Sequence, residues 1–405
     1  MQSIAATMAD HSSSPPIPVF RLMDLPNELI KMICNNEELK IKDLKALRLT
    51  NKLLCEIVTN RFAEKCFHEI AVVMSRPSLQ VFNQLSQHPR LGPYVSRIKI
   101  SPIFVPRTGC QTVTLETLQF YENREAAERE LSESGDAERM LGISFGAFAD
   151  REQAISLAFT EDESNTVGGK GLLSIVDNEK NYSWTSRWKE MIEITIRAVF
   201  DHNCKISELQ LQDKGFSSYR VEHASSFCTD KIAAQLESVC SRLTLIRVEH
   251  CNTDIKILSK SVKRMVKAAK QLKEFHLFQF NEVNDVVPEI IKDVASVSLE
   301  KATIAFAEIY FSDLIAFLHT HKQTLTEFDL SVACILGGTC KDLIAWIKEH
   351  LVHLRCLVME GVCNHHIGAY GCDVTYSCTI DAHEDMQACL ADISNGKREI
   401  RDVEH

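Results

Sequence analysis

The feature that most restricts the fold of this chain is a short apolar strand pattern that recurs through its carboxy-terminal half. It appears in "SELQLQ", "LTLIRVEH", "LKEFHLFQF", "KATIAF", "LTEFDLSV" and "LRCLVME". Successive copies lie about 25 to 37 residues apart, separated by helical stretches such as "FSDLIAFLHTHKQTL", a spacing typical of repeats with one strand and one helix per unit. Because one unit cannot bury its own apolar face, we expect an α/β solenoid with parallel strands on the concave side and helices outside.

The same alternation begins before the midpoint of the chain. "IAVVM" at Ile70–Met74 predicts a strand, and "PSLQVFNQLSQ" after it places Leu79, Phe82 and Leu85 on one helical face. The prolines and glycine of "HPRLGP" end that helix, and "YVSRIKI" follows with a second strand pattern. This segment predicts a first strand-helix unit with a short linker.

An acidic region interrupts the pattern between about 112 and 170. "ENREAAERELSESGDAERM" has helix formers and predicts a solvated surface helix, whereas "TEDESNTVGGKG" predicts a loop. "GGKG" lacks the GxxxxGK[ST] spacing of a phosphate-binding loop. We therefore interpret 112–170 as an acidic, partly disordered insertion whose charge suits a basic target or a solvated surface.

Three short leucine-rich helices open the folded part of the chain. Asp24 is a candidate N-cap with Pro26 in the first turn, and Asp43 is a candidate cap for the second helix. The apolar positions fall at helical spacing in "LPNELIKMI", "IKDLKALRLT" and "NKLLCEIVTNRF". Helices this short cannot each bury a broad apolar surface, so they are expected to pack on one another and on a partner, or to cap the end of the solenoid.

This opening segment resembles the F-box motif, through "LPNELIKMI" followed by "IKDLKALRLTNKLLCEI". The chain after it is similar to filamentous-fungal F-box proteins with a degenerate leucine-rich-repeat-like carboxy-terminal region. Asn51 departs from the motif, where many members carry Cys. Sequence patterns divide the chain into five parts, two of which take their names from the resemblance: a disordered tail at 1–19, the F-box at 20–70, a linker and first strand-helix unit at 71–111, the insertion at 112–170, and a substrate-recognition region at 171–405.

What the resemblance implies is a docking role. The F-box would bind a Skp-type adaptor and, through it, cullin and RING subunits, while the repeats would bind an unknown protein substrate for ubiquitination. The implied adaptor-binding residues are Leu25, Pro26, Leu29, Ile30, Ile33, Leu44, Leu47 and Arg48. The chain would then be a non-catalytic subunit that acts by holding a target near a ubiquitin-loaded enzyme. A non-degradative repeat scaffold, whose F-box serves only for assembly, fits the same sequence.

Metal binding and catalysis have weak support in the sequence. The segment after Leu357 contains thiols and imidazoles that zinc prefers, but without paired ligand spacing, so we expect no metal and no cofactor. These residues are Cys363, His365, His366, Cys372, Cys378 and His383. A zinc-dependent enzyme built on them is the third hypothesis. The serine-hydrolase, zincin, kinase and dinucleotide motifs do not occur.

Charge and cysteine content narrow the cellular setting. A formal charge of −10 without a basic stripe argues against nucleic-acid binding, and the basic face of "KSVKRMVKAAK" is typical of a solvated amphipathic helix. The 15 cysteines are scattered through apolar patterns, and the first residues lack the features of a signal peptide. We therefore expect reduced, mostly buried thiols, no membrane association, and a cytoplasmic or nuclear location.

Overall fold

The computed structural model of the chain describes residues 22–101, 133–160, 187–213, 232–250, 255–279, 286–294, 297–364, 376–380 and 401–402, with a few positions between 119 and 131 and residue 390. It divides into two compact units. Met1–Cys66 is called here the helical unit, and Phe67–His405 the strand-helix unit. The tail predicted at 1–19 and the "GGKG" sequence lie outside the described residues.

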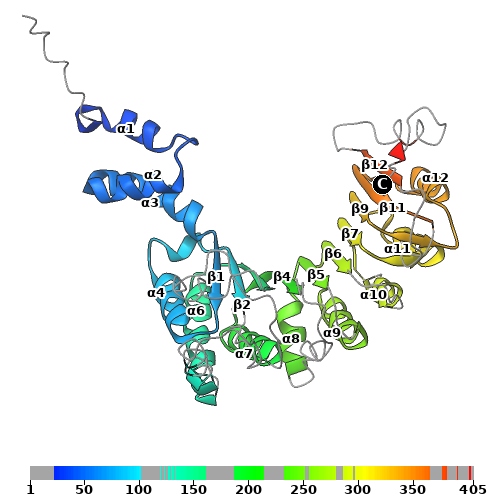
Figure 1. Cartoon of the computed structure of the whole chain (residues 1–405), viewed down its shortest axis with the longest axis horizontal. Helices are drawn as coiled ribbons and strands as arrows, with labels where there is room; N and C mark the ends of the chain where they lie inside the picture. The colour runs from blue at the N-terminus through cyan, green and yellow to red at the C-terminus, as the bar shows by residue number, and fades with distance from the viewer. Residues whose placement is uncertain are drawn as a thin grey trace, which may run out of the picture. The chain divides into compact units, whose positions relative to one another are not determined.

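The described part of the helical unit contains one 3-10 turn and three helices (Figure 1). These are η1 (Leu22–Asp24), α1 (Asn27–Cys34), α2 (Ile41–Thr50) and α3 (Lys52–Phe67). Their small apolar core contains Ile30, Cys34, Leu44, Leu54, Val58, Phe62 and Ala63. Arg61 of α3 donates a 3.0 Å hydrogen bond to the carbonyl of Cys34, which satisfies an acceptor at the end of α1.

Two helix starts in this unit differ from the sequence prediction. Asp24 closes η1 and is not the N-cap of α1, because Pro26 occupies the cap position directly before Asn27. Asp43 is the third residue of α2, and its carboxylate accepts a 2.9 Å hydrogen bond from the backbone N–H of Lys40. A carboxylate in the first turn still satisfies a free donor and faces the positive end of the helix dipole.

The strand-helix unit contains helices that alternate with strands along the chain. Its helices are α4 (Arg76–Gln87), η2 (Gly92–Tyr94), α6 (Asp136–Asp150), α7 (Arg187–Asp201), α8 (Ala233–Cys240), α9 (Ile255–Ala268), α10 (Val286–Val294), α11 (Phe311–His321) and α12 (Cys340–His350). The main strands are β1 (Glu69–Val73), β2 (Arg97–Ser101), β3 (Ile155–Thr160), β4 (Ile206–Asp213), β5 (Leu245–His250), β6 (Glu274–Gln279), β7 (Lys301–Ala305), β9 (Glu327–Ser331) and β11 (Cys356–Val362).

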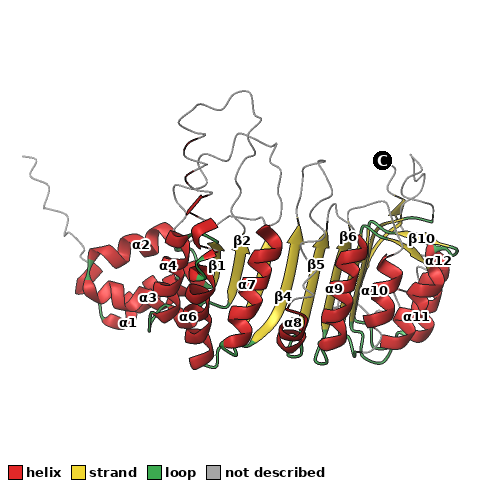
Figure 2. Ribbon diagram, turned by 90° about the horizontal axis from the view of Figure 1, so that it is seen from below, coloured by secondary structure: helices red, strands yellow, loops and turns green. Residues whose placement is uncertain are grey.

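These strands form one sheet in chain order, and each pairs in parallel with the next. The described helices of this unit cover one face of the sheet (Figure 2), and the strands lie on the inner side of its curve (Figure 1). The unit is therefore a mostly parallel α/β structure with a solenoid-like arrangement. This confirms the predicted α/β class and the positions of the strand patterns in the carboxy-terminal half.

The fold follows from alternation in the strands and a 3.6-residue period in the helices. In β6, Phe275 and Leu277 are buried, whereas Glu274 and His276 between them are partly exposed on the other face. In α11, the buried set is Leu314, Phe317, Leu318 and His321. Equivalent positions along the unit join in one apolar core, from Ile70 in β1 to Leu390.

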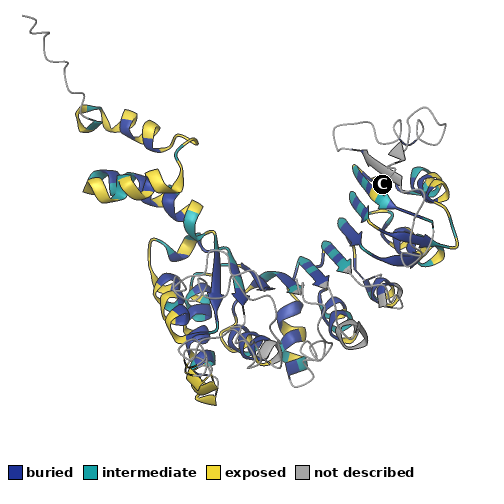
Figure 3. Ribbon diagram, in the orientation of Figure 1, coloured by how far each residue is buried: buried dark blue, intermediate teal, exposed yellow. Residues whose placement is uncertain are grey.

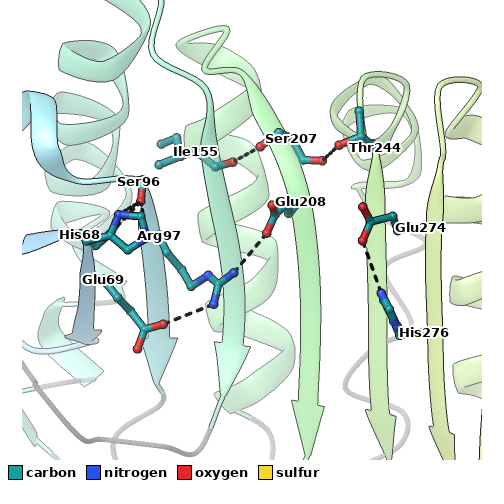
Figure 4. Close-up of polar contacts among 10 residues, drawn as sticks. All are labelled: His68, Glu69, Ser96, Arg97, Ile155, Ser207, Glu208, Thr244, Glu274 and His276. Atoms are coloured by element: carbon teal, nitrogen blue, oxygen red, sulfur yellow. Dashed lines mark hydrogen bonds and ion pairs between the residues drawn. The ribbon is translucent and has the colours of Figure 1, made fainter. Parts of the chain in front are cut away.

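The starts of the strands are aligned by a repeated hydroxyl contact (Figure 4). The side chain of Thr244 donates to the carbonyl of Ser207 at 3.1 Å, and Ser207 donates in turn to the carbonyl of Ile155 at 3.4 Å. Thr326 makes the same contact with the carbonyl of Glu300 at 3.0 Å. These contacts hold equivalent residues of neighbouring units in register.

The predicted insertion at 112–170 contains part of the repeat array. Within it, α6 and β3 supply a helix and a fully buried strand, and β3 pairs with both β2 and β4. Phe145 and Phe148 of α6 lie 6.2 and 6.1 Å, between ring centroids, from Phe82 of α4. The array therefore runs on through this region, and the prediction of an insertion is wrong for residues 136–160.

The carboxy-terminal end departs from a simple repeat. A small parallel pair joins β8 (Glu308–Tyr310) to β10 (Cys334–Leu336), and β12 (Tyr376–Ile380) and β13 (Arg401–Asp402) extend the sheet in antiparallel fashion. Cys334 and Cys363 form a disulfide. The expectation of a thiol at these two positions is therefore wrong, whereas Cys34, Cys204, Cys240 and Cys340 are free and buried.

Candidate functional site

An apolar stripe on α1 is the clearest exposed hydrophobic feature of the helical unit. Leu29 and Ile33 are each 43% exposed and Met32 is 69% exposed, at positions i, i+4 and i+3 of one helix. Ile30 and Cys34, on the other side of the same helix, are buried in the core. The helix is thus apolar on two sides, and packing within the unit covers one of them.

Three more apolar residues of this unit face solvent. Met23 and Ile41 are exposed, and Leu49 near the end of α2 is 89% exposed. Figure 3 shows exposed residues along α1 and α2, whereas the sheet strands of the other unit are largely buried. Scattered exposed apolar residues are ordinary, but the α1 stripe places three of them within about one turn. That concentration is typical of a contact surface.

The eight residues predicted to bind an adaptor divide into two groups. Pro26, Leu29 and Ile33 are exposed, and Leu25, Leu47 and Arg48 are partly exposed. Ile30 and Leu44, in contrast, are 1% and 0% exposed. The assignment of Ile30 and Leu44 to a partner-facing surface is corrected, because both side chains are used to hold the helices together. The sequence prediction also omitted Met32, which the helical spacing of α1 would have found.

Arg48 has an internal role in this unit. Its guanidinium lies 4.1 Å from the ring centroid of Phe62 in α3, a cation–π contact between α2 and α3. Its Nε is buried and has no hydrogen-bond partner. Arg48 therefore joins two helices of the unit and remains partly exposed.

A broad groove of about 1130 Å³ runs between α1 and α3. It is lined by Asn27, Lys31, Asn35, Glu37, Leu53, Glu56, Ile57, Asn60, Arg61, Glu64 and Lys65. Two of its cations bind carbonyl groups of the unit itself, Arg61 as above and Lys65 through a 3.1 Å bond to the carbonyl of Leu39. The groove is lined mainly by polar side chains of both charges, whereas the α1 stripe is apolar.

The second candidate surface is the face of the sheet that the described helices leave open, called here the concave face. Strand register arranges its side chains in three rows that cross the sheet from β1 to β11. The first row reads Glu69, Arg97, Ser156, Glu208, Leu245, Glu274, Lys301, Glu327 and Cys356. The middle row reads Ala71, Lys99, Ala158, Gln210, Arg247, His276, Thr303, Asp329 and Val358. The third reads Val73, Ser101, Thr160, Gln212, Glu249, Phe278, Ala305, Ser331 and Glu360.

Ion pairs cross the strands at the amino-terminal end of this face. Arg97 lies between two carboxylates, with Nη1 3.5 Å from Glu69 and Nη2 3.4 Å from Glu208 (Figure 4). Lys99 is 2.6 Å from the same Glu69, and Lys301 is 3.0 Å from Glu327 further along. These pairs neutralise the cations of β2 and β7.

The middle of the face combines a histidine, an aromatic ring and half-buried acids. Nδ1 of His276 lies 2.9 Å from the hydroxyl of Thr303, and burial, followed by the charge of Arg247, lowers the pKa of His276. Arg247 pairs with Glu249 and lies 4.6 Å from the ring of Phe278. Burial raises the pKa of Asp329, against the effect of its hydrogen bond with Ser331. The face is polar, and the hydroxyl of Thr303 and the imidazole of His276 lie within hydrogen-bond distance of each other on it.

The buried thiols do not show the environment of a nucleophile. Burial raises the pKa of Cys204 and of Cys340 to about 12, and raises that of Cys240 as well. Of the residues considered for zinc, Cys363 is in the disulfide, whereas His365, His366, Cys372 and His383, and the side chain of Cys378, lie outside the described residues. Within the described part of the chain, no group of three or more His, Cys, Asp or Glu side chains is placed to hold a metal.

Two comparisons with known proteins gave no match. No protein-family model matches the chain, and no curated protein matches its sequence. Among the helices of the described residues, none combines the length and apolar character required to cross a membrane.

Proposed function

We propose that the chain is the substrate-recognition subunit of a Skp-cullin-F-box ubiquitin ligase. The helical unit would be the F-box that docks a Skp-type adaptor, and the strand-helix unit a leucine-rich-repeat-like array that holds the target on its concave face. The observation that carries the proposal is the α1 stripe of Leu29, Met32 and Ile33. Covering such an exposed stripe with a partner removes apolar surface from water, which stabilises the complex.

The arrangement also supports a division of roles between the two units. Burying one exposed Leu or Ile against a partner contributes roughly 1.5 to 3 kcal/mol, so a few such residues can anchor an adaptor. An open sheet face with polar rows suits selective recognition, since charged and polar groups discriminate between partners. The chain would take no chemical part in ubiquitin transfer, because holding the target near the ubiquitin-loaded enzyme is enough for its role.

The test is a pull-down of the full chain with a purified Skp-type adaptor. Leu29→Ser/Ile33→Ser should lower adaptor affinity by at least about tenfold, because two apolar anchors are lost. The matched control is Val81→Ser/Val352→Ser, which changes two exposed valines of the strand-helix unit. Variants at Leu44 are avoided because this residue is buried and its loss would also unfold the unit. Wild-type protein that ignores the adaptor would refute the proposal.

A non-degradative scaffold would use the same adaptor contact. The two functions separate in a reconstituted ligase that contains cullin, RING subunit and a captured target. Ubiquitin transfer to the target, lost with Leu29→Ser/Ile33→Ser, supports the ligase. Adaptor binding without transfer supports the scaffold.

A further inference from the structure

The concave face differs in exposure from one end of the sheet to the other. At β3 it is buried, and the ion pair of Arg97 with Glu208 crosses that strand at the position of Ser156. From β6 to β11, Glu274, His276 and Asp329 are partly exposed and Glu360 is exposed. A partner can therefore reach polar side chains of the face between β6 and β11.

The same face has an excess of negative charge. Its three rows contain the carboxylates Glu69, Glu208, Glu249, Glu274, Glu327, Asp329 and Glu360, and the cations Arg97, Lys99, Arg247 and Lys301. Every one of those cations forms an ion pair with a carboxylate of the face. Glu274, Asp329 and Glu360 form no ion pair with a described Lys or Arg. The nearest ionisable contact of Glu274 is His276 at 3.8 Å.

These three unpaired carboxylates lie on a diagonal of the sheet. Glu274 is in the first row on β6, Asp329 in the middle row on β9, and Glu360 in the third row on β11. With strands about 4.8 Å apart and a rise of about 3.3 Å per residue, the Cα steps along the diagonal are about 12 and 8 Å. In an extended chain, alternate side chains on one face are spaced by about 6.6 to 7 Å, so cations two and four positions apart approximate these steps.

Asp329 differs from Glu360 because its carboxylate is partly buried. It is partly buried between Thr303 and Val358 of the neighbouring strands, and burial opposes its charged form. An incoming Lys or Arg would supply the missing counter-charge in a partly desolvated position, where such a pair is stronger than at an exposed surface.

We infer that the concave face from β6 to β11 binds an extended, lysine- or arginine-rich segment of the target protein. The basic side chains pair with Glu274, Asp329 and Glu360. The inference rests on the proposed function, since it specifies the target class of the recognition unit.

The test measures fluorescence anisotropy of labelled peptides with the full chain. The probe is an alternating Lys-Thr peptide of about ten residues, and the counter-probe is the matching Glu-Thr peptide. Wild-type protein should bind the basic probe saturably at low ionic strength and more weakly as salt rises, and should not bind the acidic probe. Glu274→Gln/Asp329→Asn/Glu360→Gln should weaken basic-probe binding by about tenfold.

The matched control removes the same charge from the helical side. Glu237, Glu289 and Glu349 are exposed on α8, α10 and α12, and their triple change to Gln should leave binding of the basic probe unchanged. Equal weakening by both triples, or no saturable binding by wild type, would overturn the inference. Circular dichroism and urea midpoints check that both triples are folded. Adaptor binding is scored separately, so loss of peptide binding with adaptor binding intact refutes the target class alone.

Discussion

The two units place their apolar residues in opposite ways. In the helical unit, apolar side chains of α1 face solvent next to a small core, whereas the strand-helix unit buries most of its apolar residues and leaves charged side chains of the concave face partly exposed. A small unit has too little interior to cover all of its apolar surface, and a repeat array covers it by stacking neighbours. The contrast suggests that the first surface supplies affinity and the second supplies selection.

The sharpest test of this contrast compares two isoleucines of α1. Ile30→Ala should lower the free energy of unfolding of the helical unit by about 2–5 kcal/mol, because Ile30 is fully buried in its core. Ile33→Ala, three residues later and exposed, should change it by less than about 0.5 kcal/mol. Urea unfolding followed by circular dichroism measures both.

Both variants should weaken adaptor binding, but for different reasons. Ile33→Ala should weaken the adaptor contact in a folded protein, whereas Ile30→Ala weakens it by unfolding the unit. Equal losses of stability for the two variants would contradict the prediction, because they would show that Ile30 and Ile33 have the same role in the unit. The strand-helix unit should keep its own unfolding transition in both variants, since its core is separate from these residues.

A smaller effect, specific to the strand-helix unit, is expected from pH. His321 is 1% exposed, both of its ring nitrogens lack hydrogen bonds, and burial lowers its pKa to about 4 from 6.5. The unfolded state therefore binds this proton first, and stability falls as pH drops from about 6.5 to 4, by roughly 3 kcal/mol at the acid end. His321→Leu should remove this slope.

The pH effect also distinguishes the two units. The described helical unit, residues 22–66, contains no histidine, so its stability should not change through this mechanism. Thermal unfolding at pH 7.0, 6.0 and 5.0 gives the slope for wild type and His321→Leu, where these pH values are chosen to span roughly the ordinary pKa of histidine. Parallel slopes for the two proteins would show that the proton binds elsewhere.

Sequence patterns predicted much of the fold but less of the surfaces. The strands from β4 to β11 could be predicted because their buried residues alternate along the sequence, as Phe275 and Leu277 do. The pair α6 and β3 was missed because an acidic flank hid an apolar period that includes Phe145 and Phe148. Ile30 and Ile33 both fit the apolar period of α1. Packing against the other helices decides which of the two is exposed, and the sequence period does not show that packing.

The concave face illustrates a further limit of the sequence. Glu274, Asp329 and Glu360 are far apart along the chain, and strand register alone brings them onto one diagonal. Arg97 and Glu208 are likewise separated by 111 residues and meet across β3. A single sequence indicates that each strand has a polar face, but it does not give the register that makes neighbours of these residues.

The smallest expected effect concerns the ion pairs of the concave face. Arg97→Ala removes the contacts with Glu69 and Glu208, but all three side chains are about one-third exposed, so the loss of stability should stay below about 1 kcal/mol. Arg97→Met keeps the apolar stem and separates packing from charge. The charge effect should shrink further in about 1 M salt, where screening is nearly complete over such distances. A loss of several kcal/mol in urea unfolding would show that this pair supports the sheet, and that the open face is structural at its amino-terminal end as well as available for recognition.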